Sequence, residues 1–197
     1  MKKTLLLLPL LVLLLQVVSS SVQAQTEKGN MMVGMQVANI GGTFQDGGNT
    51  FNLNLTPSAA YFVRNNLAIG GMLDLGLATQ NKLTTFSYGI GPWARYYFTT
   101  PQEMDFSSHA AFFIDGFVGL QGVSHENGGN TNGLGIKVGP GISYFISSMV
   151  SLDASVNYNL ILGFGNTATV NKIGLNIGFQ VFLPAFSLKE KFQNEGF

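Results

Sequence analysis

The sequence predicts an all-β protein: a closed antiparallel eight-stranded up-and-down transmembrane β-barrel. Apolar residues alternate with polar or small residues at a period of two, the pattern of strands with one apolar face. Each alternating run has about ten residues, the length of a tilted strand that crosses a bilayer. Only 10% of the 197 residues are charged, against about a quarter in ordinary soluble domains. We therefore expect the apolar faces to contact lipid and the polar faces to line the lumen.

The clearest element is a hairpin over residues 51–79. Apolar side chains alternate with asparagine, threonine and serine over residues 51–61, and leucine alternates with alanine, glycine and aspartate over residues 67–77. The turn sequence Arg64-Asn65-Asn66 separates the two runs. Two alternating runs joined by an asparagine-rich turn are typical of a β-hairpin.

The same pattern recurs in six further runs: residues 31–40, 86–96, 110–123, 134–144, 150–160 and 172–181. With the hairpin they make eight strands, an even number at the small end of the outer-membrane barrels. The polar, glycine-rich segment 41–49 is predicted to be a loop. Pro92 cannot donate to the ladder and predicts a bulge in its strand. An open sheet edge cannot be left in hydrocarbon, so the barrel is expected to close.

The N-terminus has the features of a secretion signal. Lys2 and Lys3 precede an apolar core at residues 5–18, which small residues follow. The core is short for a spanning helix of about 20 residues. We expect residues 1–24 to be a cleaved signal peptide, residues 25–183 to form the barrel, and residues 184–197 to form a polar C-terminal tail. Secretion followed by insertion of a barrel predicts the outer membrane of a Gram-negative bacterium.

Composition argues against several other functions. The formal net charge is zero, which gives no electrostatic reason to expect a nucleic-acid partner. The chain has no cysteine, so disulfides and cysteine metal sites are not expected. His109 and His125 lie far apart in the sequence and form no metal-ligand pattern. We predict no metal and no cofactor.

Alternation places six charged side chains on the inward faces of the strands: Asp74, Arg95, Asp115, Lys137, Asp153 and Lys172. An eight-stranded barrel is just wide enough for side chains to fill it, and buried charges persist when they are paired. Asp115 lies between the strands of Arg95 and Lys137, and Lys137 lies on the strand next to that of Asp153. We expect these neighbours to pair into a polar network that plugs the lumen. A path for protons or solutes lined by the same groups is the alternative.

An enzyme is a further alternative, because Ser124-His125-Glu126 contains the residue types of a nucleophilic triad. We expect this segment to lie in the loop 124–132. Adjacent residues of an extended chain point in different directions, so a solvated polar loop is the favoured interpretation. No catalytic residue is predicted.

Two segments carry a family resemblance: Pro57 to Gly70, PSAAYFVRNNLAIG, and Gly89 to Phe98, GIGPWARYYF. Through them residues 30–183 resemble the small outer-membrane β-barrel family of OmpX-type and OmpA-transmembrane-type proteins, in the variety found in Bacteroidetes-type bacteria. The resemblance implies contact with membrane lipid and lipopolysaccharide. It also implies insertion by the outer-membrane assembly machinery, which reads an aromatic residue at the end of the last strand; Phe182 and Phe197 are the candidates.

The family has no shared catalytic or ligand signature. We therefore predict a non-catalytic integral outer-membrane barrel, expected to be a monomer, with a structural or surface-interaction role. A small porin-like channel for minor solutes is the alternative, and a lipid A-modifying enzyme is a third, less favoured class.

Overall fold

The structure, a computed structural model, describes residues 26–45, 48–80, 83–98, 109–126, 130–164 and 169–184. The expected signal peptide 1–24, the connection 99–108 and residues 185–197 of the expected tail lie outside the described residues. The domain bounds drawn from the sequence at both ends of the chain therefore stay predictions.

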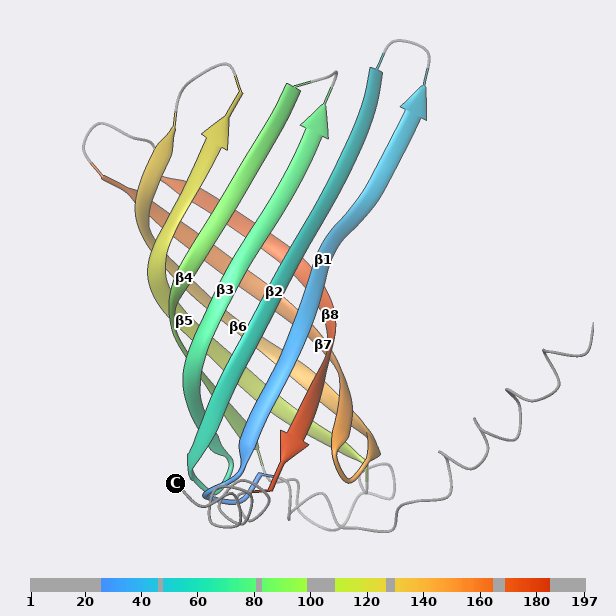
Figure 1. Cartoon of the computed structure of the whole chain (residues 1–197), viewed down its shortest axis with the longest axis vertical. Coiled ribbons are helices and arrows are strands. Elements are labelled where there is room, and N and C mark those ends of the chain that lie inside the picture. The colour runs from blue at the N-terminus through green and yellow to red at the C-terminus, as the bar shows by residue number, and fades with distance from the viewer. Residues whose placement is uncertain are drawn as a thin grey trace, which may run out of the picture.

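Eight strands form a closed barrel in which each strand is antiparallel to its neighbours and β8 returns to β1 (Figure 1). This confirms the predicted fold class. The strands are β1 Met31–Gln45, β2 Gly48–Arg64, β3 Leu67–Gln80, β4 Leu83–Phe98, β5 Ala110–His125, β6 Thr131–Ser147, β7 Val150–Gly163 and β8 Val170–Leu183. No helix among the described residues is long and apolar enough to cross a membrane.

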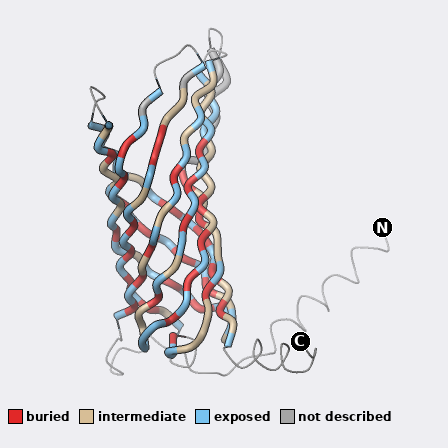
Figure 2. The backbone as a smooth tube through the Cα atoms, turned by 60° about the vertical axis from the view of Figure 1, so that its left-hand side comes forward, coloured by how far each residue is buried: buried red, intermediate tan, exposed pale blue. Residues whose placement is uncertain are grey.

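The alternation seen in the sequence sets the two faces of the barrel wall. On β3, Leu73, Leu75 and Leu77 are exposed on the outside, whereas Met72 and Asp74 are buried inside. Figure 2 shows the same change from buried to exposed along the strands. Because successive side chains point to opposite faces, the apolar set lies outside and the polar and aromatic set fills the lumen.

The turn between β2 and β3 fixes one end of the barrel, which we call the terminal end because β1 begins and β8 finishes there. Asn66 has φ 66°, a left-handed conformation that asparagine tolerates better than most residues. Its backbone N–H donates to the carbonyl of Thr26 at 2.7 Å, and Thr26 Oγ1 donates to Asn66 Oδ1 at 2.6 Å. These bonds hold the segment before β1 against the turn. We call the opposite end the loop end.

The strands are longer than the sequence predicted. Most of the predicted loop 41–49 is strand, because β1 continues to Gln45 and β2 begins at Gly48. Ser124 and His125 likewise belong to β5 rather than to a loop. Antiparallel pairing satisfies backbone groups whether or not a face is buried, so polar, glycine-rich sequence extends the hairpins.

The bulge predicted at Pro92 is wrong. Pairing of β4 with β5 lapses between Ile90↔Leu120 and Trp93↔Phe117, and the register is the same on both sides. The missing N–H of proline removes a ladder bond without inserting a residue. The register shifts lie elsewhere, including one on β1 between Ala38 and Gly41.

Candidate functional site

The lumen is organised around Arg95 of β4, whose side chain is fully buried. Arg95 Nε donates to Asp115 Oδ1 at 2.7 Å, and Arg95 Nη2 donates to Asp115 Oδ2 at 2.9 Å. The two residues are register partners on β4 and β5. Two parallel bonds between a guanidinium and a carboxylate make a strong, orientation-specific pair. The structure therefore brings these two predicted site residues together.

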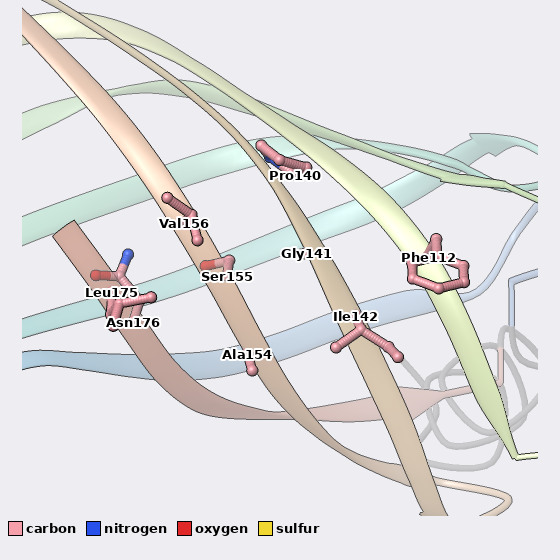
Figure 3. A pocket seen from close by; sticks show the side chains of 9 residues that line it. All are labelled: Phe112, Pro140, Gly141, Ile142, Ala154, Ser155, Val156, Leu175 and Asn176. Carbon is pink, nitrogen blue, oxygen red and sulfur yellow. The ribbon is translucent and has the colours of Figure 1, made fainter. Parts of the chain in front are cut away.

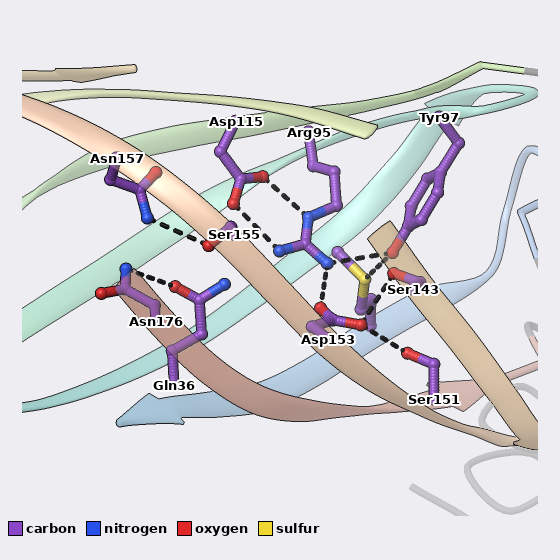
Figure 4. Close-up of polar contacts among 11 residues, drawn as sticks. Gln36, Arg95, Tyr97, Asp115, Ser143, Ser151, Asp153, Ser155, Asn157 and Asn176 are labelled. Atoms are coloured by element: carbon purple, nitrogen blue, oxygen red, sulfur yellow. Dashed lines mark hydrogen bonds and ion pairs between the residues drawn. The ribbon is translucent and has the colours of Figure 1, made fainter. Parts of the chain in front are cut away.

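The same guanidinium reaches across the lumen to β7. Arg95 Nη1 donates to Asp153 Oδ2, and also to the hydroxyl of Tyr97 at 3.1 Å. The other carboxylate oxygen, Asp153 Oδ1, accepts bonds from Ser143 Oγ at 2.7 Å and Ser151 Oγ at 2.9 Å. The side chains come from β4, β5, β6 and β7, and Figure 4 shows the contacts that join them. We call Arg95, Asp115 and Asp153 the lumen triad.

An apolar cluster, which we call the aromatic layer, contacts the lumen triad on its terminal side. It consists of Met32, Phe62, Tyr97, Phe113, Phe145 and Phe182. Neighbouring ring centroids lie 5.3 to 6.4 Å apart. The Arg95 guanidinium carbon lies 3.7 Å from the centroid of the Phe113 ring, a cation–π contact. The polar lumen expected from the sequence is thus polar only in part, because six strands contribute apolar side chains at this end.

Glycine on the inner face makes room for these large side chains. Gly141 of β6 is the register partner of Phe113. A Cβ at Gly141 would overlap the Phe113 ring and lie 2.8 Å from the backbone oxygen of Ala154. The close packing of this level therefore requires glycine opposite the ring.

A second ion pair lies outside the lumen triad. Lys137 Nζ of β6 is 2.6 Å from Asp74 Oδ2 of β3, and each side chain is 11% exposed. The expected pairing of Lys137 with Asp115 or Asp153 is wrong, since Arg95 engages both of those carboxylates. In a narrow lumen a lysine side chain is long enough to reach a strand on the opposite wall. Lys137 therefore pairs across the lumen rather than with a residue of an adjacent strand.

A small cavity, the loop-end cavity, lies beyond this second pair. Its volume is about 60 Å³, and its lining includes Asn54, Asp74, Ser87, Gln121, Asn159 and Lys172. The amide oxygens of Asn54, Gln121 and Asn159 are buried without a hydrogen-bond partner. Lys172 is exposed and forms no ion pair with any described residue. Lys172, the sixth predicted lumen charge, thus belongs neither to the lumen triad nor to the pair of Lys137 and Asp74.

An apolar groove runs over the outer surface of β5 to β8 (Figure 3). Its volume is about 300 Å³, and its lining includes Phe112, Pro140, Ile142, Ala154, Val156 and Leu175. The short side chain of Ala154 lies between bulkier neighbours, which leaves the surface hollow there. Apolar groups dominate the lining, so the groove suits a hydrocarbon chain.

The segment Ser124-His125-Glu126 does not form a joined nucleophilic group in the described contacts. Ser124 Oγ donates to Asn130 Oδ1 at 2.9 Å, and Glu126 Oε2 accepts from the backbone N–H of Thr84 at 3.0 Å. The His125 side chain lies outside the described part. Within that part, no three histidine, aspartate or glutamate side chains lie close enough to hold a metal ion.

Residues 10–181 match the sequence model of the family described as outer membrane protein beta-barrel domain. This chain belongs to that family. Its place is therefore the outer membrane, and the apolar outer faces of the strands contact membrane lipid.

Solved structures agree with the fold. Neisserial surface protein A is 22% identical with a TM-score of 0.56, and the match covers 78% of this chain and 97% of that one. The N-terminal β-barrel domain of OprF from Pseudomonas aeruginosa is 12% identical with a TM-score of 0.50, covering 79% and 98%. At these identities the likeness shows the fold alone. No curated protein matches the chain.

Proposed function

We propose that this protein is a non-catalytic integral outer-membrane barrel with a side-chain-filled lumen and a structural or surface-interaction role. The observation that supports this most strongly is the Arg95 guanidinium, which joins Asp115 on one wall to Asp153 across the lumen. An eight-stranded barrel has little bore to spare. A bridge across the lumen therefore leaves little room for a solute to pass.

Two further levels of contact support a closed lumen. The aromatic layer lies on the terminal side of the bridge and includes fully buried rings from Phe62, Phe113 and Phe182. The pair of Lys137 and Asp74 crosses the lumen on the other side. A continuous water path has to disrupt all three levels, and buried charges separated from their partners are costly.

In this proposal the terminal end faces the periplasm and the protein is a monomer. Phe182, the last inward aromatic residue of β8, serves as the residue that the assembly machinery reads. The even strand number supports the orientation, since it places the start of β1 and the end of β8 at one end of the barrel.

A channel for minor solutes is the second candidate, and the loop-end cavity favours it. The cavity lining does not include Arg95, Asp115 or Asp153. In the closed-lumen account the cavity is a recess that stops at the pair of Lys137 and Asp74. In the channel account the same cavity is the entrance to a pore.

Swelling of protein-containing vesicles in small sugars separates the two. The closed lumen predicts the same swelling rate as protein-free vesicles, with a general porin as the positive control. Faster swelling than in protein-free vesicles contradicts the proposal and favours the channel.

The enzyme alternative has its own test, a mass spectrum of lipid A from cells that produce the protein. We expect the lipid A masses to match those of cells without it, because Ser124 and Glu126 bind other partners. A lost or added acyl chain that disappears in Ser124→Ala shows instead that the protein is a lipid A-modifying enzyme.

A further inference from the structure

The seam between the first and last strands closes only part of the way. β1 pairs with β8 from Met31↔Leu183 to Ala38↔Asn176. Both strands continue toward the loop end: β1 reaches Gln45 beside β2, and β8 residues 170–175 pair with β7. In the described strands, no pair joins β1 to these residues of β8. Figure 1 shows β1 and β8 running apart toward the loop end.

The outward side chains of β8 are highly exposed along this opening and at its edge, where Ile177 still pairs with Val37 of β1. Ile173, Leu175 and Ile177 are 78%, 72% and 70% exposed, more than any other large apolar residue of the described wall. On the inner face, a Cβ at Gly174 would meet no atom within 4 Å. The opening between β1 and β8, which we call the window, therefore has apolar side chains on its membrane face and free space on its lumen face.

The same segment of β8 borders both the window and the loop-end cavity. Lys172 lines the cavity and lies on β8 within the segment that lacks a β1 partner. Leu175, three residues further along β8, is also part of the lining of the outer apolar groove. A molecule at the window thus touches a polar cavity on one side and an apolar surface on the other.

The chemistry of the cavity indicates what its polar part would bind. Lys172 supplies a cation without a carboxylate partner in the described residues, which suits a phosphate. Three amide oxygens without partners accept hydrogen bonds from hydroxyl groups. Gln121 carries one of them and is only 4% exposed. The volume of about 60 Å³ corresponds to about four to six waters, enough for a small polyol group, while the exposed Lys172 is placed to hold a phosphate at the edge of the cavity.

The unpaired backbone groups of β8 at the window also favour a polar ligand there. Strand edges without a partner are not left in hydrocarbon, because unpaired N–H and C=O groups there are costly. Ile173 and Leu175 of this segment are exposed apolar side chains on the outer face, so the unpaired edge borders membrane lipid. A polar headgroup in the window can bond these backbone groups while its acyl chain stays in lipid.

We propose that the window and the loop-end cavity form a binding site for a membrane phospholipid with an anionic, hydroxyl-bearing headgroup. The phosphate lies against Lys172, and the hydroxyl groups face the amides of Asn54, Gln121 and Asn159. An acyl chain leaves through the window and lies along Ile173 and Leu175 toward the outer groove. The site goes beyond the structural role proposed above and does not depend on closure of the lumen at Arg95.

Photolabelling of the folded chain in vesicles tests the site. The probe is phosphatidylglycerol with a diazirine in one acyl chain, present as a trace in phosphatidylcholine vesicles. We expect labelled peptides to come mainly from β8 and β1 at the window. Lys172→Gln should lower this labelling about fivefold, the effect expected for one cation near an anionic headgroup. Gly174→Leu, which fills the free space, should lower it as well.

Matched controls separate binding from folding and from general charge effects. Lys28→Gln removes an exposed lysine at the terminal end and should leave window labelling unchanged. The folded fraction of each variant is first measured by heat-dependent gel mobility, and labelling is expressed per folded molecule. Inorganic phosphate added as a competitor should not displace the lipid.

Three results overturn the proposal. The first is labelling spread evenly over the outward faces of all strands. The second is window labelling that Lys172→Gln and Lys28→Gln change equally. The third is complete displacement by inorganic phosphate, which shows a site for the free anion rather than for a lipid.

Discussion

Arg95 and Asp115 face each other as register partners on β4 and β5, and two bonds of 2.7 and 2.9 Å join their side chains. The same guanidinium also binds Asp153. One cation with two carboxylates leaves the lumen triad with an excess of one negative charge, which the hydroxyls of Ser143 and Ser151 help to stabilise. Arg95 is the one cation of the lumen triad and bonds both aspartates. Its removal should therefore destabilise the protein more than removal of either aspartate.

The first prediction follows from this asymmetry. Arg95→Met leaves two buried carboxylates without their cation and should lower the free energy of unfolding by about 3–5 kcal/mol. Asp115→Asn leaves a neutral pair of Arg95 and Asp153 and should cost about 1.5–3 kcal/mol, the value of a hydrogen bond to a charged group. Urea unfolding in lipid vesicles measures both. Glu27→Gln, at an exposed site, is the control and should change stability by less than about 0.5 kcal/mol. A larger loss for Asp115→Asn than for Arg95→Met contradicts the arrangement.

The second prediction concerns the pair of Lys137 and Asp74. A double-mutant cycle with Lys137→Gln and Asp74→Asn should show a coupling energy of about 0.5–3 kcal/mol, as for side chains in direct contact. The same cycle with Lys137→Gln and Asp115→Asn should show a smaller coupling, because Asp115 is bound to Arg95. Reversed magnitudes would mean that Lys137 pairs with its neighbouring strand, as expected from the sequence.

The third prediction tests which face meets lipid. Leu73 lies on the outer face in the middle of β3, and Leu162 lies on the outer face at the loop end of β7. Leu73→Arg should lower the folding free energy in bilayers by about 2–4 kcal/mol, whereas Leu162→Arg, near the interface, should cost about 0–1 kcal/mol. Folding titrations in vesicles measure the difference. Equal small costs at both depths are incompatible with a membrane-embedded outer face.

The fourth prediction uses the glycine opposite Phe113. Gly141→Ala places a methyl group against the ring and should cost about 1–3 kcal/mol, the range for overpacking a filled core. Gly116→Ala is the matched control, since a Cβ at Gly116 meets no atom within 4 Å. Phe113→Leu should recover part of the loss in Gly141→Ala. Equal stability of the two alanine variants contradicts the close packing of the aromatic layer.

The fold was predictable because alternation and strand length are local properties of the sequence. The two faces of β3 could be assigned from its leucines, and the turn at Asn66 from its asparagines. The pairing of Arg95 with Asp115 could also be predicted, because it joins adjacent strands. The contacts of Arg95 with Asp153 and of Lys137 with Asp74 could not be predicted from the sequence. They depend on how far the strands shift along one another when the sheet closes.

The sequence does carry a signal for the aromatic layer. Phe62, Tyr97, Phe145 and Phe182 each lie two residues beyond an inward position, so continuing the alternation to the strand ends places them inside. The window had no comparable signal. It depends on the register shift in β1 after Ala38 and on where pairing with β8 stops, which sequence periodicity does not specify.

Ion current through single proteins in a planar bilayer shows whether side chains close the lumen. We expect no steady conductance for the wild-type protein, because the lumen triad and the aromatic layer fill the cross-section. Reproducible open-channel steps in the wild type, with an ion selectivity that Asp115→Asn shifts without loss of stability, would contradict the closed lumen and establish a pore.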